Sequence, residues 1–227
     1  NVVLMGQTEN LTPADKTLYA LRDVTGTVES IPLIASSIMS KKIASGCDAL
    51  VLDIKCGNGA FMTNLNSAKE LAETMIQIGK SVNKKVVAVI TDMNQPLGNN
   101  IGNSLEVIEA IEILKGNISG RLKEVAIELG SQMLVLGEIC KSVSEAKNML
   151  EENIKNRKGL EKLGQIITAQ NGNSEVINNY SLFPLSKMKK VLTAETSGYI
   201  SSINTHNVGK ASCETGAGRK TKEDVID

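Results

Sequence analysis

The sequence predicts an α/β protein with a mixed, largely parallel sheet covered by helices. Two short apolar runs, at residues 49–54 and 86–90, have the length and composition of buried strands, and residues 67–82 show a helical pattern between them. Buried strands joined through a helix are typical of a parallel sheet. We expect a helical hairpin before them, at residues 13–45, and a β-rich subdomain at the C-terminus.

The hairpin begins with residues that favour a helix start. Thr12 is of a type that caps helix N-termini, Pro13 suits the first helical position, and Asp15 places negative charge where the helix dipole favours it. This first helix is expected to end near residue 23. A second begins at Ser30-Ile31-Pro32 and continues with apolar residues at helical spacing until Gly46 stops it.

The remaining elements follow from changes in pattern along the chain. They are a short strand at residues 2–6, a loop at 94–103, helices at 104–115, 121–140 and 144–170 with a break near Gly159, a polar linker at 171–179, and an alternating stretch at 191–203. The predicted domains are residues 1–12 and 46–170 of the α/β domain, the hairpin at 13–45, and an incomplete β-rich subdomain at 171–227. We expect both ends of the sequence to be cuts through a longer protein.

Composition excludes several classes of function. The 227 residues are 41% hydrophobic and 22% charged, which is typical of a globular core. Lys plus Arg and Asp plus Glu both number 25, giving a net charge of zero, and there is no Trp, so we expect no nucleic-acid partner. No apolar run reaches the length of about 18 residues needed for a membrane span. Four cysteines without C-x-x-C spacing, and one His, argue against structural zinc and favour a reduced, cytoplasmic protein.

Four polar residues of the hairpin stand out as a candidate site. Tyr19 and Arg22 are three apart on the first helix, and Ser37 and Lys41 are four apart on the second, so each pair shares a helix face. Two cations, a hydroxyl and a phenol suit a planar, oxygen-rich ligand that becomes negative during reaction. Spacing alone leaves a second interpretation open, in which Arg22 is a solvated charge and Ser37 a tolerated interior residue.

Three further features carry weaker signals. The segment Gly57-Asn58-Gly59 could hold phosphate after a strand, but it lacks the further residues of known phosphate motifs and equally fits a simple turn. Residues 97–109 could offer carbonyls and a carboxylate to a hard cation, or merely connect two elements. His206 has no nearby acid in the sequence to orient it, which favours a surface role over that of a general base.

Longer motifs resemble the signature of thymidine and pyrimidine-nucleoside phosphorylases. The matching segments are residues 18–28, 30–42, 53–62, 91–98, 102–107, 216–219 and 221–224. The resemblance implies a small all-α domain, to which the hairpin at residues 13–45 would belong, beside a larger α/β domain. It also implies a cytoplasmic homodimer that cleaves pyrimidine nucleosides such as uridine, thymidine and deoxyuridine with inorganic phosphate. The products would be the free base and a pentose 1-phosphate, as in nucleoside salvage. No organic cofactor is implied.

The same resemblance assigns roles to individual residues. Tyr19, Arg22, Ser37 and Lys41 match base-recognition positions, with Arg22 and Lys41 stabilising negative charge on the departing base, and Phe61 matches a wall of the base pocket.

A potassium ion, or a similar cation, is implied beside three further residues. Leu97 and Asn100 would offer backbone carbonyls to it, and Glu109 would offer a carboxylate.

Two alternatives remain open. One is a strict thymidine phosphorylase, and the other is an inactive binding or dimerisation fragment of the same family. The family's glycine-rich phosphate segment precedes the part of the sequence given, so we expect the isolated 227-residue chain to be inactive. Residues 213–215 are also more polar than the family pattern.

Overall fold

The structure is a computed structural model that describes residues 10–184, 186 and 188–218. The chain divides into two compact units, one made of residues 1–92 and 125–150 and the other of 93–124 and 151–227. The strand expected at residues 2–6 and the matching segment at 221–224 lie outside the described residues. The predicted domain boundaries stay predictions.

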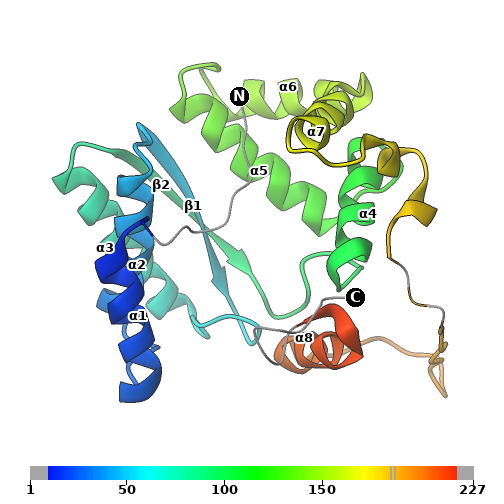
Figure 1. The fold of residues 1–227 in the computed structure, drawn as a ribbon, viewed down its shortest axis with the longest axis horizontal. Coiled ribbons are helices and arrows are strands. Elements are labelled where there is room, and N and C mark those ends of the chain that lie inside the picture. Colours follow the sequence, from blue (N-terminus) through cyan, green and yellow to red (C-terminus); the bar gives the residue numbers. More distant parts are fainter. Residues whose placement is uncertain (1–9, 185, 187, 219–227) are drawn as a thin grey trace. The chain divides into compact units, whose positions relative to one another are not determined.

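The first unit contains the hairpin and the sheet (Figure 1). Its elements are α1 (Pro13–Thr25), α2 (Ile31–Ala44), β1 (Ala49–Cys56), α3 (Leu65–Ser81) and β2 (Lys85–Asp92). The two strands pair in parallel from Ala49 opposite Lys85 to Cys56 opposite Asp92. The predicted α/β class and the strand–helix–strand crossover are therefore confirmed.

The core of this unit lies between the sheet and the helices α2 and α3. Alternate residues of β1 are buried, because successive side chains of a strand point to opposite faces. These residues pack with one face of α2 and one face of α3, and the buried apolar cluster is Ile34, Ala35, Met39, Leu50, Leu52, Ile54, Met62, Ala68, Leu71, Ala72 and Met75. The hairpin is thus fixed to the sheet through α2.

The remaining elements are helical. They are α4 (Asn103–Leu114), α5 (Arg121–Leu136), α6 (Val143–Lys155), α7 (Lys158–Ala169), the short helices η1 (Ser174–Ile177) and η2 (Tyr180–Leu182), α8 (Thr205–Ser212) and η3 (Cys213–Ala217). The unit boundaries fall within α5 and α6. In the second unit α4 and η1 both pack against α7.

A polar cluster ties η2 to the end of α4 in the second unit. The Tyr180 hydroxyl donates to Glu112 and accepts a hydrogen bond of 2.7 Å from Lys115 Nζ. Lys115 Nζ also lies 3.2 Å from Glu112 Oε1. The hydrogen bond from Tyr180, followed by those from Asn117 and Lys115, outweighs burial and lowers the pKa of Glu112 to about 2.

Left-handed backbone conformations mark two helix boundaries. The helix expected to reach residue 140 ends earlier, at Leu136, where Gly137 is followed by Glu138 with φ of 60°. The break expected near Gly159 is present and lies at Arg157, whose φ is 62°. A left-handed residue cannot continue a right-handed helix, so each stops there.

The C-terminal stretch also differs from its prediction. Within the described residues of 171–218 the structure contains helical turns and irregular chain, and no strand. Val191, Leu192 and Tyr199 are almost fully exposed, at 83%, 85% and 103%. An alternating sequence forms a strand only where another strand pairs with it, and the described residues supply none here.

None of the described helices is long and apolar enough to cross a membrane.

Candidate active site

The candidate site lies between α1 and α2 of the first unit. Helix α1 starts with Pro13 and ends at Thr25. The next residue, Gly26, has a left-handed φ of 66°, and its N–H donates to the Arg22 carbonyl. The predicted cap at Thr12 is wrong. Thr12 itself has φ of 51° and makes no cap hydrogen bond, and its hydroxyl instead donates to the Leu11 carbonyl at 2.8 Å.

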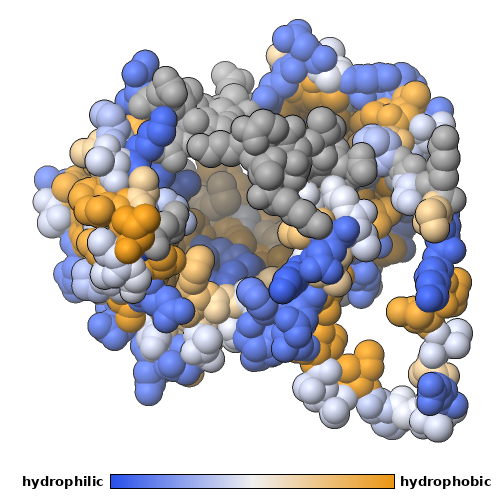
Figure 2. Space-filling view, turned by 60° about the horizontal axis from the view of Figure 1, so that its bottom comes forward, coloured by the Kyte–Doolittle hydropathy of each residue, from blue (hydrophilic) through white to orange (hydrophobic). Residues whose placement is uncertain are grey.

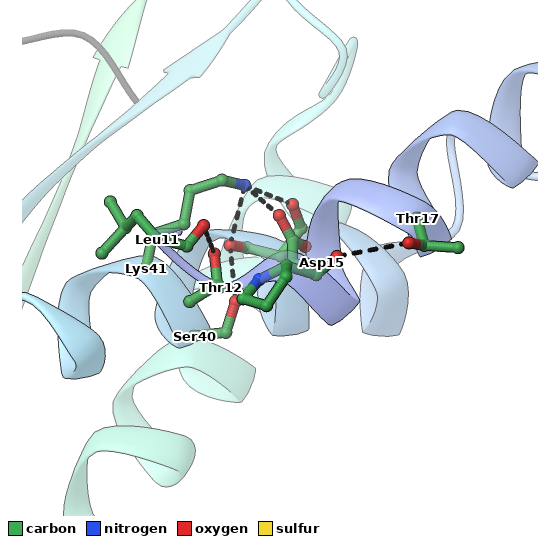
Figure 3. A network of polar contacts seen from close by, with 8 residues as sticks. Leu11, Thr12, Asp15, Thr17, Ser40 and Lys41 are labelled. Atoms are coloured by element: carbon green, nitrogen blue, oxygen red, sulfur yellow. Dashed lines mark hydrogen bonds and ion pairs between the residues drawn. The ribbon is translucent and has the colours of Figure 1, made fainter. Parts of the chain in front are cut away.

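Lys41 is the centre of a polar network that joins the two helices (Figure 3). Its ammonium nitrogen lies 2.5 Å from Asp15 Oδ2 and donates to Ser37 Oγ at 2.9 Å and to the Ser37 carbonyl at 3.2 Å. An ammonium has three hydrogens, so these three acceptors match its full donor capacity. The predicted proximity of Ser37 and Lys41 on one face of α2 is present in the structure.

Asp15 is the negative charge of this network. Its side chain is only 10% exposed, and burial raises its pKa. Hydrogen bonds from Lys41 and Ser37, together with the positive charges of Lys41 and Arg22, outweigh that burial and lower the pKa of Asp15 below its ordinary value. Asp15 is therefore ionised at neutral pH and holds Lys41 in place.

Arg22 is buried beside the network and is not fully satisfied. It is 6% exposed, its Nη2 donates to the Val28 carbonyl, and its Nε has no hydrogen-bond partner. The guanidinium carbon lies 5.1 Å from the centre of the Tyr19 ring, and Lys41 Nζ lies 5.9 Å from the same centre. Both cations thus face one aromatic ring, which is a favourable arrangement for positive charge. A buried donor without a partner is unfavourable unless a ligand satisfies it.

A cavity of about 100 Å³ opens between the helices at this point. Its lining residues are Asp15, Leu18, Tyr19, Leu21, Arg22, Thr25, Thr27, Leu33, Ser36 and Ser37. The lining thus includes three of the four residues predicted from the hairpin spacing, Tyr19, Arg22 and Ser37. The fourth, Lys41, does not line the cavity and joins this group by donating to Ser37 Oγ. Phe61, predicted as a wall of the base pocket, lies in the turn after β1, is 67% exposed and does not line this cavity.

The predicted cation residues lie in the second unit, around the start of α4. Glu109 is 3% exposed, and its two carboxylate oxygens accept hydrogen bonds from the backbone N–H groups of Asn99 at 2.8 Å and Asn100 at 2.9 Å. Gly98 allows this close approach, because a Cβ there would lie 2.5 Å from Glu109 Oε2. The loop that carries Leu97 and Asn100 is thus held against the carboxylate.

Within the described part of the chain no Lys or Arg pairs with Glu109, and the partners of its two carboxylate oxygens are backbone N–H groups. A cation held by this carboxylate and by the carbonyls of Leu97 and Asn100 stays a prediction. Among the described residues, no group of three His, Cys, Asp or Glu side chains could hold a metal ion together.

Sequence reasoning missed the role of Asp15 in the site. It identified Asp15 only as a charge that favours the start of α1. The signal was present, because Asp15, Tyr19 and Arg22 follow one another at spacings of four and three and share a helix face. The Val28 carbonyl, which orients Arg22, has no such signal, since every residue carries a backbone carbonyl.

The chain is similar to known proteins along its whole length. The family described as "Glycosyl transferase family, a/b domain" matches residues 1–160. Pyrimidine-nucleoside phosphorylases of Staphylococcus epidermidis, Geobacillus stearothermophilus and Bacillus subtilis are 53%, 52% and 52% identical over 226 residues. Each alignment covers 100% of this chain and 52% of the relative, so the chain spans about half the length of the curated relatives it matches. The resemblance to pyrimidine-nucleoside phosphorylases is confirmed, and the chain belongs to this glycosyl transferase family.

Proposed function

We propose that the full-length protein catalyses the phosphorolysis of pyrimidine nucleosides to the free base and a pentose 1-phosphate. The observation that supports this most is that two cations, Arg22 and Lys41, both lie near the Tyr19 ring. Arg22 lines the cavity between α1 and α2, and Lys41 donates to Ser37 of the same lining. The relatives that match the whole chain are named for this activity.

The reaction needs positive charge where the base leaves. A phosphate oxygen forms a bond to C1′ while the bond from C1′ to the base nitrogen breaks, and the electron pair of that bond stays on the base. A pyrimidine base spreads this charge onto its carbonyl oxygens, which accept hydrogen bonds from cationic donors. Each such hydrogen bond contributes about 1.5–3 kcal/mol, and one well-placed donor changes the rate by about 10²–10³.

The two cations are prepared for this role in different ways. Arg22 Nε is buried and has no partner, so it can donate to a base oxygen without losing an existing bond. Lys41 already donates to Asp15 and Ser37, so a base oxygen would replace one of these acceptors. The weakest of the three by length is the 3.2 Å bond to the Ser37 carbonyl. Tyr19 presents a ring face beside both cations.

Other parts of the proposal rest on separate features. Inorganic phosphate would be the co-substrate, and potassium would bind at Glu109 with the carbonyls of Leu97 and Asn100.

A homodimer is supported by the exposed apolar stripe on α1, where Leu18, Leu21 and Val24 are 56%, 53% and 80% exposed. Figure 2 shows hydrophobic side chains on the surface of the molecule. Free cysteines are consistent with cytoplasmic nucleoside salvage.

The test is phosphate-dependent release of base by the full-length protein. Uracil release from uridine and thymine release from thymidine are compared, because a strict thymidine phosphorylase would use only the second. Arg22→Ala and Lys41→Ala should each lower kcat/KM by about two orders of magnitude or more. Lys42→Ala is the matched control, since Lys42 is the exposed neighbour of Lys41. Near-normal kcat/KM in both site variants would show that these residues do not carry the reaction.

A further inference from the structure

The loop at residues 97–103 is held from one side by carboxylates of α4. Glu109 accepts the backbone N–H groups of Asn99 and Asn100, and Glu106 Oε1 accepts the N–H of Gly102 at 3.0 Å. Both acids lie on the helix that the loop leads into. These contacts join residues that are close in sequence, and they fix the loop to α4.

The end of this loop and the first turn of α4 are also held by residues far along the chain. Ser212 Oγ donates to the Ile101 carbonyl at 3.3 Å, and Asn103 Nδ2 donates to the Ala217 carbonyl at 3.2 Å. The Ser104 hydroxyl donates to the Pro184 carbonyl at 3.2 Å. Three of four consecutive residues thus bond to partners that are 80 to 114 positions away.

Gly102 also lies close to the segment at residues 212–217. Its φ of 137° is a conformation that glycine adopts readily, and a Cβ there would lie 3.5 Å from the Ala217 Cβ. The segment 212–217 therefore packs directly on the turn that begins α4. Loop, helix start and segment all lie in the second unit.

We propose that the turn at residues 212–217 is the second anchor of the 97–103 loop, with Asn103 and Ser212 as positioning residues. Their side chains donate to backbone carbonyls, those of Ala217 and Ile101. They act through the loop, by holding it in the conformation in which Glu109 binds its backbone. Their effect on cation binding rests on the proposed function, which places a potassium ion at this loop.

The expected size of the effect follows from the bonds that are lost. A neutral intramolecular hydrogen bond is worth a factor of about 2–10 in a conformational equilibrium. When only a fraction of the protein has the binding-competent loop, the apparent dissociation constant rises by the inverse of that fraction. Chemistry in the cation-bound enzyme is unaffected, because the same loop conformation is reached once the ion is bound.

The experiment compares variants of the full-length protein. Asn103→Ala and Ser212→Ala each remove one donor, and Ser212→Thr keeps the hydroxyl. Asn207→Ala and Ser202→Ala are matched controls, because both are exposed residues whose side chains have no partner in the described structure. Two quantities are measured: amide hydrogen exchange in peptides that cover residues 97–103, and the potassium concentration that gives half-maximal activity.

Both alanine variants should exchange about 2- to 10-fold faster in residues 97–103 than the controls do. The half-saturating potassium concentration should rise by a similar factor, with kcat at saturating potassium within about twofold of the wild type. Ser212→Thr should restore both values. Unchanged exchange in both alanine variants would overturn the proposal. If the wild type responds to potassium, faster exchange with an unchanged potassium requirement would overturn it too. A wild type without any potassium response would refute the cation assignment, whereas faster exchange would still support the anchor.

Discussion

The ion pair between Asp15 and Lys41 should contribute measurably to the stability of the hairpin. The change is a double-mutant cycle with Asp15→Asn, Lys41→Met and the combination of both. Each single variant leaves one charged or polar partner behind, and the combined variant removes both charges. The interaction energy is the change in the free energy of unfolding of the double variant minus the sum of the changes in the two single variants.

Its magnitude lies between two measured limits. Exposed ion pairs contribute about 0.2–1 kcal/mol, whereas breaking a fully buried pair costs about 3–5 kcal/mol. Here the nitrogen and oxygen are 2.5 Å apart, with the Lys41 side chain 27% exposed and the Asp15 side chain 10% exposed. Because one partner is buried and the other is partly solvated, we expect an interaction energy of about 1–3 kcal/mol.

The pH dependence of this stability has a definite sign. The pKa of Asp15 is lowered in the folded protein, so the unfolded chain binds its proton more readily. The contribution of Asp15 is therefore complete above its unfolded pKa and is lost as the pH falls through the lower folded value. The Asp15→Asn variant should lose less stability than the wild type over that acid range.

The assay is urea unfolding at pH 7 and at a series of acid pH values. Asp48→Asn is the matched control, because Asp48 is an exposed carboxylate with no partner in the described structure. An interaction energy below about 0.5 kcal/mol at pH 7 would place the pair among ordinary surface pairs. The same acid dependence in the wild type and in Asp15→Asn would show that Asp15 is not held as the structure indicates.

Two further predictions concern α4. Because Tyr180 contributes most to lowering the pKa of Glu112 to about 2, Tyr180→Phe should cost about 1.5–3 kcal/mol at pH 7. It should also flatten the loss of stability between the ordinary pKa of 4.5 and about 2; an unchanged acid unfolding curve would contradict this. Glu109→Gln keeps the side-chain shape but removes the charge, so potassium at about 10–100 times its wild-type dissociation constant should no longer add about 1.4–2.7 kcal/mol of stability. Equal potassium-dependent shifts of the melting temperature in variant and wild type would contradict the assignment.

Local patterns were sufficient to predict most of the first unit. Start signals and apolar residues at helical spacing identified α1 and α2, a helical pattern identified α3, and two short apolar runs identified β1 and β2. Each of these signals lies within the element's own residues. The same periodicity placed Arg22 with Tyr19, and Ser37 with Lys41. In those cases the information lies within one helix.

What the sequence did not predict depends on contacts between distant residues or on the backbone. The bond from Ser212 to the Ile101 carbonyl joins residues 111 positions apart, and the hydroxyl of Tyr180 reaches Glu112 across 68 positions. No periodicity within either segment encodes such a partner. Thr12 was predicted as a helix cap from its residue type, but its backbone is left-handed. A hydroxyl caps a helix only when the backbone of its own residue is extended. These features depend on the folded backbone and on distant partners, which a local sequence pattern does not contain.

Helix α2 links the core to the candidate site. Ala35 and Met39 are fully buried against the sheet and α3, while Ser37 and Lys41 on the same helix form the polar network with Asp15. Ser37 is itself 7% exposed, a position that a hydroxyl tolerates because Lys41 donates to it. The apolar packing that fixes α2 therefore also fixes the two polar groups. A site that must place cationic donors within a few tenths of an ångström gains from such a support, because the donors need no reorganisation when charge develops.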